Sequence, residues 1–172
     1  MNIAFCGYKG SGKDYAGSIV AENYGHRLIA FADPIKESIC RTYKLANNDE
    51  YDQFKRTIHT VNGKDIHGRD IVRDHGMFAR LANPNFFTTI AQEKSLESEI
   101  VITDLRFVNE YEMCKLADIV TIQVISDNTS SDGHESESID FVPDYVIHND
   151  HTYNFKIQLL KLMKEIYKNG SN

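Results

Sequence analysis

The amino-acid sequence predicts an α/β fold in which a parallel sheet is flanked by helices. Two observations carry this prediction. Short apolar segments alternate along the chain with amphipathic ones, and the first apolar segment ends in a glycine-rich turn that opens a helix. Alternating strands and helices favour parallel strands joined by right-handed connections. A length of 172 residues is typical of one domain, so we expect a single domain over residues 1–172.

Two strands and two helices are expected at the start of the chain. An apolar run at residues 2–5 indicates a buried strand, and residues 13–23 carry apolar side chains at helical spacing. Residues 27–31 indicate a second strand. Asp33 and Pro34 follow this strand, which is typical of an N-cap and the first position of a helix.

The remaining elements alternate in the same way. Residues 47–52 are polar and are predicted to form a loop, and Asn83-Pro84 interrupts a long helical region. The other expected elements are two helices within 70–92, strands at 99–103, 119–125 and 145–147, and helices at 109–116 and 153–167. The helix-rich block at 34–97 is too long for one crossover connection. We therefore expect a helical acceptor-binding subdomain there, beside a five-stranded parallel sheet.

The composition argues against several classes of protein. Lys and Arg number 19 while Asp and Glu number 25, and this net charge of −6 does not favour binding to a nucleic-acid polymer. The three cysteines are far apart, which supports neither a disulfide framework nor a zinc ribbon. No apolar run approaches the roughly 18 residues of a membrane span, and we expect a cytoplasmic location.

Residues 7–13 read Gly-Tyr-Lys-Gly-Ser-Gly-Lys and match the phosphate-binding pattern G-x-x-x-x-G-K. The pattern lies between a predicted strand and a predicted helix, where backbone N–H groups and the helix N-terminus attract phosphate. Asp14 stands where such loops usually place a Ser or Thr that binds Mg²⁺, and a carboxylate also suits this ion. The residues predicted to bind ATP are Gly7, Lys9, Gly10, Ser11, Gly12, Lys13 and Asp14.

Motor ATPases, GTPases and small-molecule kinases share this loop, so other features of the sequence are needed to distinguish these classes. Motors and helicases usually need a longer chain, and the sequence lacks the Asn-Lys-x-Asp motif of guanine recognition. Both observations favour a small-molecule kinase.

Further motifs resemble those of the phage deoxynucleoside monophosphate kinase family, a branch of the P-loop kinases that is also similar to phosphomevalonate kinase. The matching segments are Lys9–Asp14, Phe31–Lys36, Gly68–Asp70 with Gly76, Thr103–Phe107 with Asn109 and Glu110, His134–Glu137, and Asp144–Asp150. The phosphate loop and the pair Asp104 and Arg106 are the most specific of them.

The resemblance implies ATP- and Mg²⁺-dependent phosphorylation of a deoxynucleoside 5′-monophosphate to the diphosphate. This is a transferase reaction that supplies nucleotides for DNA synthesis. The resemblance also implies a phage origin, and hence a location in the host cytoplasm.

Phosphoryl transfer depends on positioning and on neutralising charge, so the site needs cations and a metal ion. Lys13 and Lys9 are expected to neutralise the ATP phosphates. Asp104 and Arg106 are expected at the carboxyl end of the third predicted strand, where ligands of such sheets bind. We expect Mg²⁺ to be held by Asp14 and Asp104. The substrate-binding candidates are Asp33, Lys36, Arg69, Arg73, Arg80, Arg106 and His134.

Some of these candidates have a second interpretation. Arg69, Arg73 and Arg80 share one face of a continuous helix, which also fits a solvated face paired with neighbouring acids. Asp104 also fits the N-cap of the helix that follows it.

Residues 126–143 are expected to form a flap. Short nucleoside monophosphate kinases often carry arginines in this segment, whereas here it contains neither Lys nor Arg and is rich in acids. Because an acidic flap repels a triphosphate, the arginines that stabilise the transition state should come from residues 69–80 and from Arg106.

Two other functions stay open at this point. One is a P-loop kinase with another small acceptor, as in dephospho-coenzyme A kinase or phosphomevalonate kinase, where Asp104 would act as a base. The other is a non-catalytic nucleotide-binding module. The preferred base, the choice between deoxyribose and ribose, and the oligomeric state are not readable, and a homodimer is compatible with the sequence.

Overall fold

The computed structural model describes residues 1–127 and 139–170. Contacts along the chain divide it into two compact units. The first unit combines Met1–Phe31 with the chain from Thr88 to the C-terminus, and the second unit is Ala32–Phe87. Each unit is described by itself.

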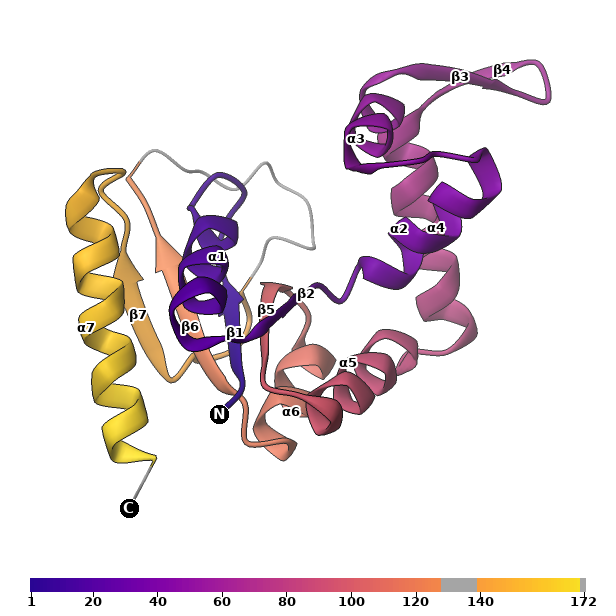
Figure 1. Cartoon of the computed structure of the whole chain (residues 1–172). Helices are drawn as coiled ribbons and strands as arrows, with labels where there is room; N and C mark the ends of the chain where they lie inside the picture. The colour runs from indigo at the N-terminus through magenta and orange to yellow at the C-terminus, as the bar shows by residue number, and fades with distance from the viewer. Residues whose placement is uncertain (128–138, 171–172) are drawn as a thin grey trace. The chain divides into compact units, whose positions relative to one another are not determined.

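A five-stranded sheet forms the centre of the first unit (Figure 1). Its strands are β1 (Ile3–Cys6), β2 (Arg27–Ile29), β5 (Ile100–Leu105), β6 (Val120–Ile125) and β7 (Tyr145–His148). The strand order is β2-β5-β1-β6-β7, and every neighbouring pair is parallel. The predicted parallel sheet of five strands is therefore confirmed.

Helices cover the sheet because successive side chains of a strand point to opposite faces. The first unit contains α1 (Lys13–Tyr24), α6 (Val108–Leu116), α7 (Tyr153–Asn169) and most of α5 (Phe86–Glu97). Buried side chains of α1 and α7 share one apolar cluster with Ile3 and Phe5 of β1. Gly17 lets α1 approach the sheet closely, since a Cβ there would lie 2.3 Å from a methyl group of Thr103.

The second unit consists of α2 (Asp33–Tyr43), α3 (Asn48–Arg56), α4 (Gly68–Ala82) and the antiparallel hairpin of β3 (Ile58–Val61) and β4 (Lys64–His67). The hairpin turns at Asn62 and Gly63, whose φ angles are 51° and 75°. Two successive residues with positive φ are typical of a type I′ turn, for which Asn-Gly is the preferred pair.

Two sequence predictions about this second unit are wrong. Residues 47–52, predicted to be a loop, open α3, because the side chain of Asn47 accepts a hydrogen bond from the backbone N–H of Glu50 at 2.9 Å. Asp33 is not the N-cap of α2, since Ala32 takes that position and Asp33 is already helical. The hairpin itself was not predicted, although its Asn-Gly pair is a readable hairpin signal.

Asp144 joins the last two strands of the first unit. Its carboxylate accepts hydrogen bonds from the backbone N–H and the hydroxyl of Thr121, and from Lys115 at 2.6 Å. Burial raises the pKa of Asp144, but the hydrogen bonds from Lys115 and Thr121 outweigh this effect and hold the pKa below its usual range. The contacts tie the start of β7 to β6 and α6.

Candidate active site at the carboxyl edge of the sheet

The phosphate loop connects β1 to α1 and depends on three glycines with positive φ. Gly7, Gly10 and Gly12 have φ angles of 148°, 81° and 93°, which side chains with a Cβ rarely adopt. At Gly7 a Cβ would also lie 2.4 Å from the carbonyl oxygen of Val124 on β6. The loop is therefore pressed against the sheet, and its path requires the glycines that the motif supplies.

The loop leaves the start of α1 open to an anion. Gly12 is the N-cap, and within the described residues no side chain caps this helix end. The first backbone N–H groups of a helix need partners, and together with the helix dipole they attract phosphate. The Ser11 hydroxyl is buried and has no hydrogen-bond partner in the described part of the chain. An unsatisfied hydroxyl and an uncapped helix in one loop fit a phosphate ligand.

Two lysines of the loop differ in their surroundings. Lys13 is only 5% exposed, and its Nζ lies 3.5 Å from the carbonyl oxygen of Tyr8. Lys9 is exposed. Burial of Cys6 beside them raises the pKa of its thiol to about 12, against smaller lowering effects of a backbone hydrogen bond and of Lys13. Cys6 is thus a neutral buried side chain, and Lys13 provides a charge at the base of the loop.

A cavity of about 610 Å³ opens beside the phosphate loop, within the first unit. Its lining residues are Gly10, Gly12, Asp14, Tyr15, Asn149, His151, Thr152 and Tyr153. The exposed Asp14 is among them, directly after Lys13 at the start of α1. The segment after β7 forms the other wall, and there the N–H and hydroxyl of Thr152 hold the pKa of Asp150 below its usual range.

Asp104 lies on β5, next to its carboxyl end. Its Oδ1 accepts a hydrogen bond from the backbone N–H of Phe31 at 2.7 Å, which holds the chain where β2 has just ended. The alternative that Asp104 caps the following helix is wrong, since the N-cap of α6 is Phe107. In this structure Asp104 therefore anchors the last residue of the first unit before the chain enters the second.

Arg106 lies in the turn between β5 and α6, in the same unit as the phosphate loop. The buried carboxylate of Glu110 accepts hydrogen bonds from the backbone N–H groups of Arg106 and Phe107, at 3.0 and 3.2 Å. Glu110 thus shapes the turn that carries Arg106. The sequence match included Glu110, but no role had been predicted for it.

The three arginines of the predicted basic face lie on α4, which is continuous from Gly68 to Ala82. Arg69 is exposed, and Arg73 forms ion pairs with Asp70 at 2.9 Å and Asp74 at 3.1 Å. The guanidinium of Arg80 lies over the ring of Phe87, 4.3 Å from its centroid. For Arg73 the structure shows the pairing with neighbouring acids that the second interpretation described.

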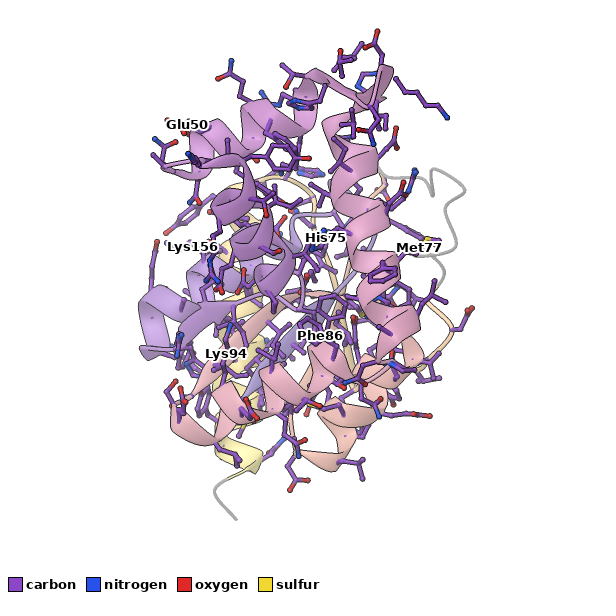
Figure 2. All side chains as sticks on the ribbon, turned by 90° about the vertical axis from the view of Figure 1, so that its right-hand side faces the viewer. Glu50, His75, Met77, Phe86, Lys94 and Lys156 are labelled. Carbon is purple, nitrogen blue, oxygen red and sulfur yellow. The ribbon has the colours of Figure 1, made fainter. Side chains whose placement is uncertain are left out.

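The other acceptor candidates of the second unit lie on α2. Asp33 is its first residue, and Lys36 places its Nζ 5.5 Å from the centre of the Tyr51 ring. Burial raises the pKa of Tyr51 to about 12. Figure 2 labels His75 of α4, whose Nε2 lies 3.1 Å from the Ser38 hydroxyl, so α2 and α4 are also joined by a polar contact.

Some predictions fall beyond what the structure describes. His134 lies outside the described residues, as does most of the predicted flap at 126–143. Among the described residues, no group of three or more His, Cys, Asp or Glu side chains could hold a metal ion by itself. None of the described helices combines the length and the apolar character needed to cross a membrane.

Asn149 is a residue of this edge to which sequence reasoning gave no role. Its side chain is 3% exposed and donates a hydrogen bond to the carbonyl oxygen of Ser11 in the phosphate loop at 2.8 Å. The two residues are 138 positions apart, so only the strand order brings them together.

Comparisons with known proteins show what the chain is similar to. A search among curated proteins finds no match. Two solved structures that resemble the chain are a dephospho-CoA kinase from Campylobacter jejuni (18% identity, 99% of this chain and 100% of that chain covered, TM-score 0.49) and a gluconokinase from Sinorhizobium meliloti (15% identity, 98% and 96% covered, TM-score 0.47). The family model described as "Deoxynucleotide monophosphate kinase" matches residues 2–82. The resemblance found in the sequence is thereby confirmed, and over residues 2–82 the chain is similar to the deoxynucleotide monophosphate kinase family.

Proposed function

We propose that this protein transfers the γ-phosphoryl group of ATP, in the presence of Mg²⁺, to a deoxynucleoside 5′-monophosphate and so forms the diphosphate. The observation that carries the proposal is the phosphate loop with its buried Lys13, which opens α1 next to a cavity of about 610 Å³. The family match over residues 2–82 supports the choice of a deoxynucleoside monophosphate as the acceptor. The product would supply DNA synthesis, and a phage origin with action in the host cytoplasm belongs to the same proposal.

The donor nucleotide would bind along the loop and in the cavity. Its phosphates would lie against the N–H groups at the start of α1, with Lys13 and Lys9 neutralising their charge. The nucleoside would lie between Tyr15 and the segment from Asn149 to Tyr153, which line the cavity. This arrangement orients the γ-phosphoryl group, and orientation with charge neutralisation is most of what phosphoryl transfer requires.

Asp14 fits a magnesium ion, because it offers exposed carboxylate oxygens at the wall of the cavity, directly after Lys13. A magnesium ion held there would offset the negative charge that develops on the phosphoryl group during transfer. Asp104 would hold the ion from the end of β5, while its Oδ1 keeps the backbone of Phe31 in place.

The candidates for holding the acceptor are polar and basic side chains of α2 and α4 in the second unit and, in the first unit, Arg106 at the end of β5. The candidate residues are Asp33, Lys36, Arg69, Arg73, Arg80, Arg106 and His134. The phosphate of a nucleoside monophosphate is already an anionic nucleophile, so no strong general base is needed. Arg73 would then exchange its ion pairs with Asp70 and Asp74 for the acceptor phosphate.

The test is to identify the phosphorylated product by ion-exchange chromatography. Mg·ATP would be incubated with each of the four common deoxynucleoside monophosphates, with their ribose counterparts, with dephospho-coenzyme A, with phosphomevalonate and with water. Lys13→Ala is the control. We expect a deoxynucleoside diphosphate with at least one deoxynucleotide and none with the Lys13 variant.

Three other results would contradict the proposal. A product only from dephospho-coenzyme A or phosphomevalonate would mean a kinase with another acceptor. ADP released equally with every acceptor and with water would mean an ATPase. ATP binding without any product would mean a non-catalytic nucleotide-binding module.

A further inference from the structure

The side chain of Asn149 packs against the phosphate loop at Ser11 and Gly12. It follows β7 and lies so close to the loop that a Cβ on Gly12 would be 2.2 Å from its Nδ2. Gly12 and Asn149 are therefore a matched pair, in which the side chain of one occupies the room that the other leaves.

Two partners define the orientation of the Asn149 amide. Its Nδ2 donates to the carbonyl oxygen of Ser11 at 2.8 Å, and its Oδ1 accepts from the backbone N–H of His151 at 2.8 Å. A carbonyl can only accept and an N–H can only donate, so the amide cannot be turned around without losing both contacts.

The end of β6 holds Asn149 in place. The backbone N–H of Asn149 donates to the carbonyl oxygen of Ile125 at 2.8 Å, and the hydroxyl of Ser126 lies 2.7 Å from Nε2 of His151. Asn149 is thus fixed to the carboxyl end of β6 before its side chain reaches the loop, and it can act as a rigid support.

The contact with Ser11 determines where the next N–H points. In a trans peptide the C=O and the N–H point in opposite directions. Because Asn149 holds the carbonyl of Ser11, the N–H of Gly12 in the same peptide is directed away from Asn149. Gly12 is the N-cap of α1 and lines the cavity, so this N–H belongs to the surface that would meet a phosphate.

We propose that Asn149 is a positioning residue that holds the Ser11–Gly12 peptide in the orientation needed to bind phosphate. Asn149 also lines the cavity, so it joins the phosphate loop to the wall against which the nucleoside would lie. The proposal rests on the donor site of the proposed function and names a residue that acts through the loop backbone.

The test uses tripolyphosphate, which carries the phosphates of ATP without the nucleoside. Its affinity for the full chain would be measured calorimetrically at a temperature where every variant is folded, together with each melting temperature without ligand. Loss of one hydrogen bond to a buried carbonyl should weaken binding by about tenfold or more in Asn149→Ala. Asn149→Asp keeps the size of the side chain but places an oxygen against the carbonyl oxygen of Ser11. Its affinity for tripolyphosphate should therefore fall by at least as much as that of Asn149→Ala.

Matched variants separate this inference from the proposed function. Asn154→Ala removes an asparagine of the same region whose amide contacts only Asp150 in the described contacts, and its affinity should stay within twofold of wild type. Four outcomes would contradict the proposals in different ways. Equal tripolyphosphate affinity in wild type and Lys13→Ala would overturn the proposed donor site itself. If Lys13→Ala loses binding while both Asn149 variants bind like wild type, only the role of Asn149 is overturned. The same holds if Asn149→Asp binds normally and only Asn149→Ala is weakened, since volume and not hydrogen bonding would then matter. A lower melting temperature of the Asn149 variants with unchanged affinity for tripolyphosphate would show that Asn149 has only a structural role.

Discussion

The two units of this chain carry their candidate residues in different ways. In the first unit the phosphate loop is built from backbone, held by buried contacts of Lys13, Asn149 and neighbouring glycines. In the second unit Arg69 and Arg73 are exposed on α4, and Arg73 is 54% exposed and paired with two acids, whereas Arg80 is half-buried against Phe87. The proposed donor site is therefore formed without a ligand, whereas Arg73 in the proposed acceptor unit would have to exchange its ion-pair partners when a ligand arrives.

The largest expected effect on turnover comes from a substitution in the phosphate loop. Lys13→Ala should lower turnover by about 10²–10³-fold, the range for removing one preorganised charge stabiliser. The coupled release of ADP with a deoxynucleotide acceptor measures it. Lys164→Ala, at an exposed lysine of α7, is the control and should leave turnover unchanged. Equal rates in the two variants would contradict a donor site at the loop.

Arg106→Ala should have the second largest effect, about 10²-fold on kcat, because its turn is shaped by the buried Glu110 at the edge of the same sheet. Arg27→Ala is a suitable control, since Arg27 lies at the amino end of β2, away from the carboxyl ends of the strands, and pairs with Glu97. A steady-state comparison that finds both variants within twofold of wild type would exclude Arg106 from the reaction.

The arginines of α4 should show a smaller and uneven effect. We expect about a tenfold loss of kcat/KM in at least one of Arg69→Ala, Arg73→Ala and Arg80→Ala, because each would contribute one contact to the acceptor phosphate. Arg73→Ala should cost the least, since binding through this residue must first break its ion pairs with Asp70 and Asp74.

The matched control for α4 is Arg56→Ala, an exposed arginine at the end of α3 in the same unit. Turnover within twofold of wild type in all three α4 variants would show that these arginines form only a solvated face.

The sequence predicts the first unit better than the second, and the reason is physical. A glycine-rich loop between a buried strand and a helix has few possible structures, so Gly7 to Lys13 could be placed in advance. The hydrogen bonds of Asn149 to Ser11 and of Asp104 to Phe31 depend on the order of strands in the sheet, which local patterns do not contain.

In the second unit the capping residue at the start of α3 decides the local structure, although the segment is polar. Residues 47–52 are polar, yet Asn47 caps α3, and the acids that follow it suit the first turn of a helix. The Asn62-Gly63 pair is a hairpin signal in the sequence, and it forms the turn between β3 and β4. The spacing of Arg73 from Asp70 and Asp74 in the sequence predicts its ion pairs. The contact of Arg80 with Phe87 depends on the path of the turn between α4 and α5, which the sequence pattern does not give.

The smallest expected effect concerns the stability of the first unit. Asp144→Asn should lower the free energy of unfolding by roughly 1–3 kcal/mol near pH 7, the range for hydrogen bonds to a charged group, with little from the exposed Lys115 itself. Since the pKa of Asp144 is lowered in the folded protein, this stability is present above the ordinary value of 3.8 and disappears as the pH falls through the folded pKa.

Urea unfolding of wild type and Asp144→Asn between pH 3 and pH 7 would check this prediction. The two curves should converge at the acidic end and separate as the pH rises. Asp118→Asn, in the turn between α6 and β6, is the comparison variant. A difference between wild type and Asp144→Asn that stays constant over the whole range would contradict the assignment.

The most direct test of the difference between the units is to map two ligands separately by NMR on the isotope-labelled chain. ADP should shift the amide signals of residues 7–14 and 149–153, whereas a deoxynucleoside monophosphate should shift signals of Arg106 and of α2 and α4 within residues 32–87. We expect two such separate sets of shifted signals. A deoxynucleotide that shifts only the signals of the phosphate loop, and none within 32–87, would contradict this expectation.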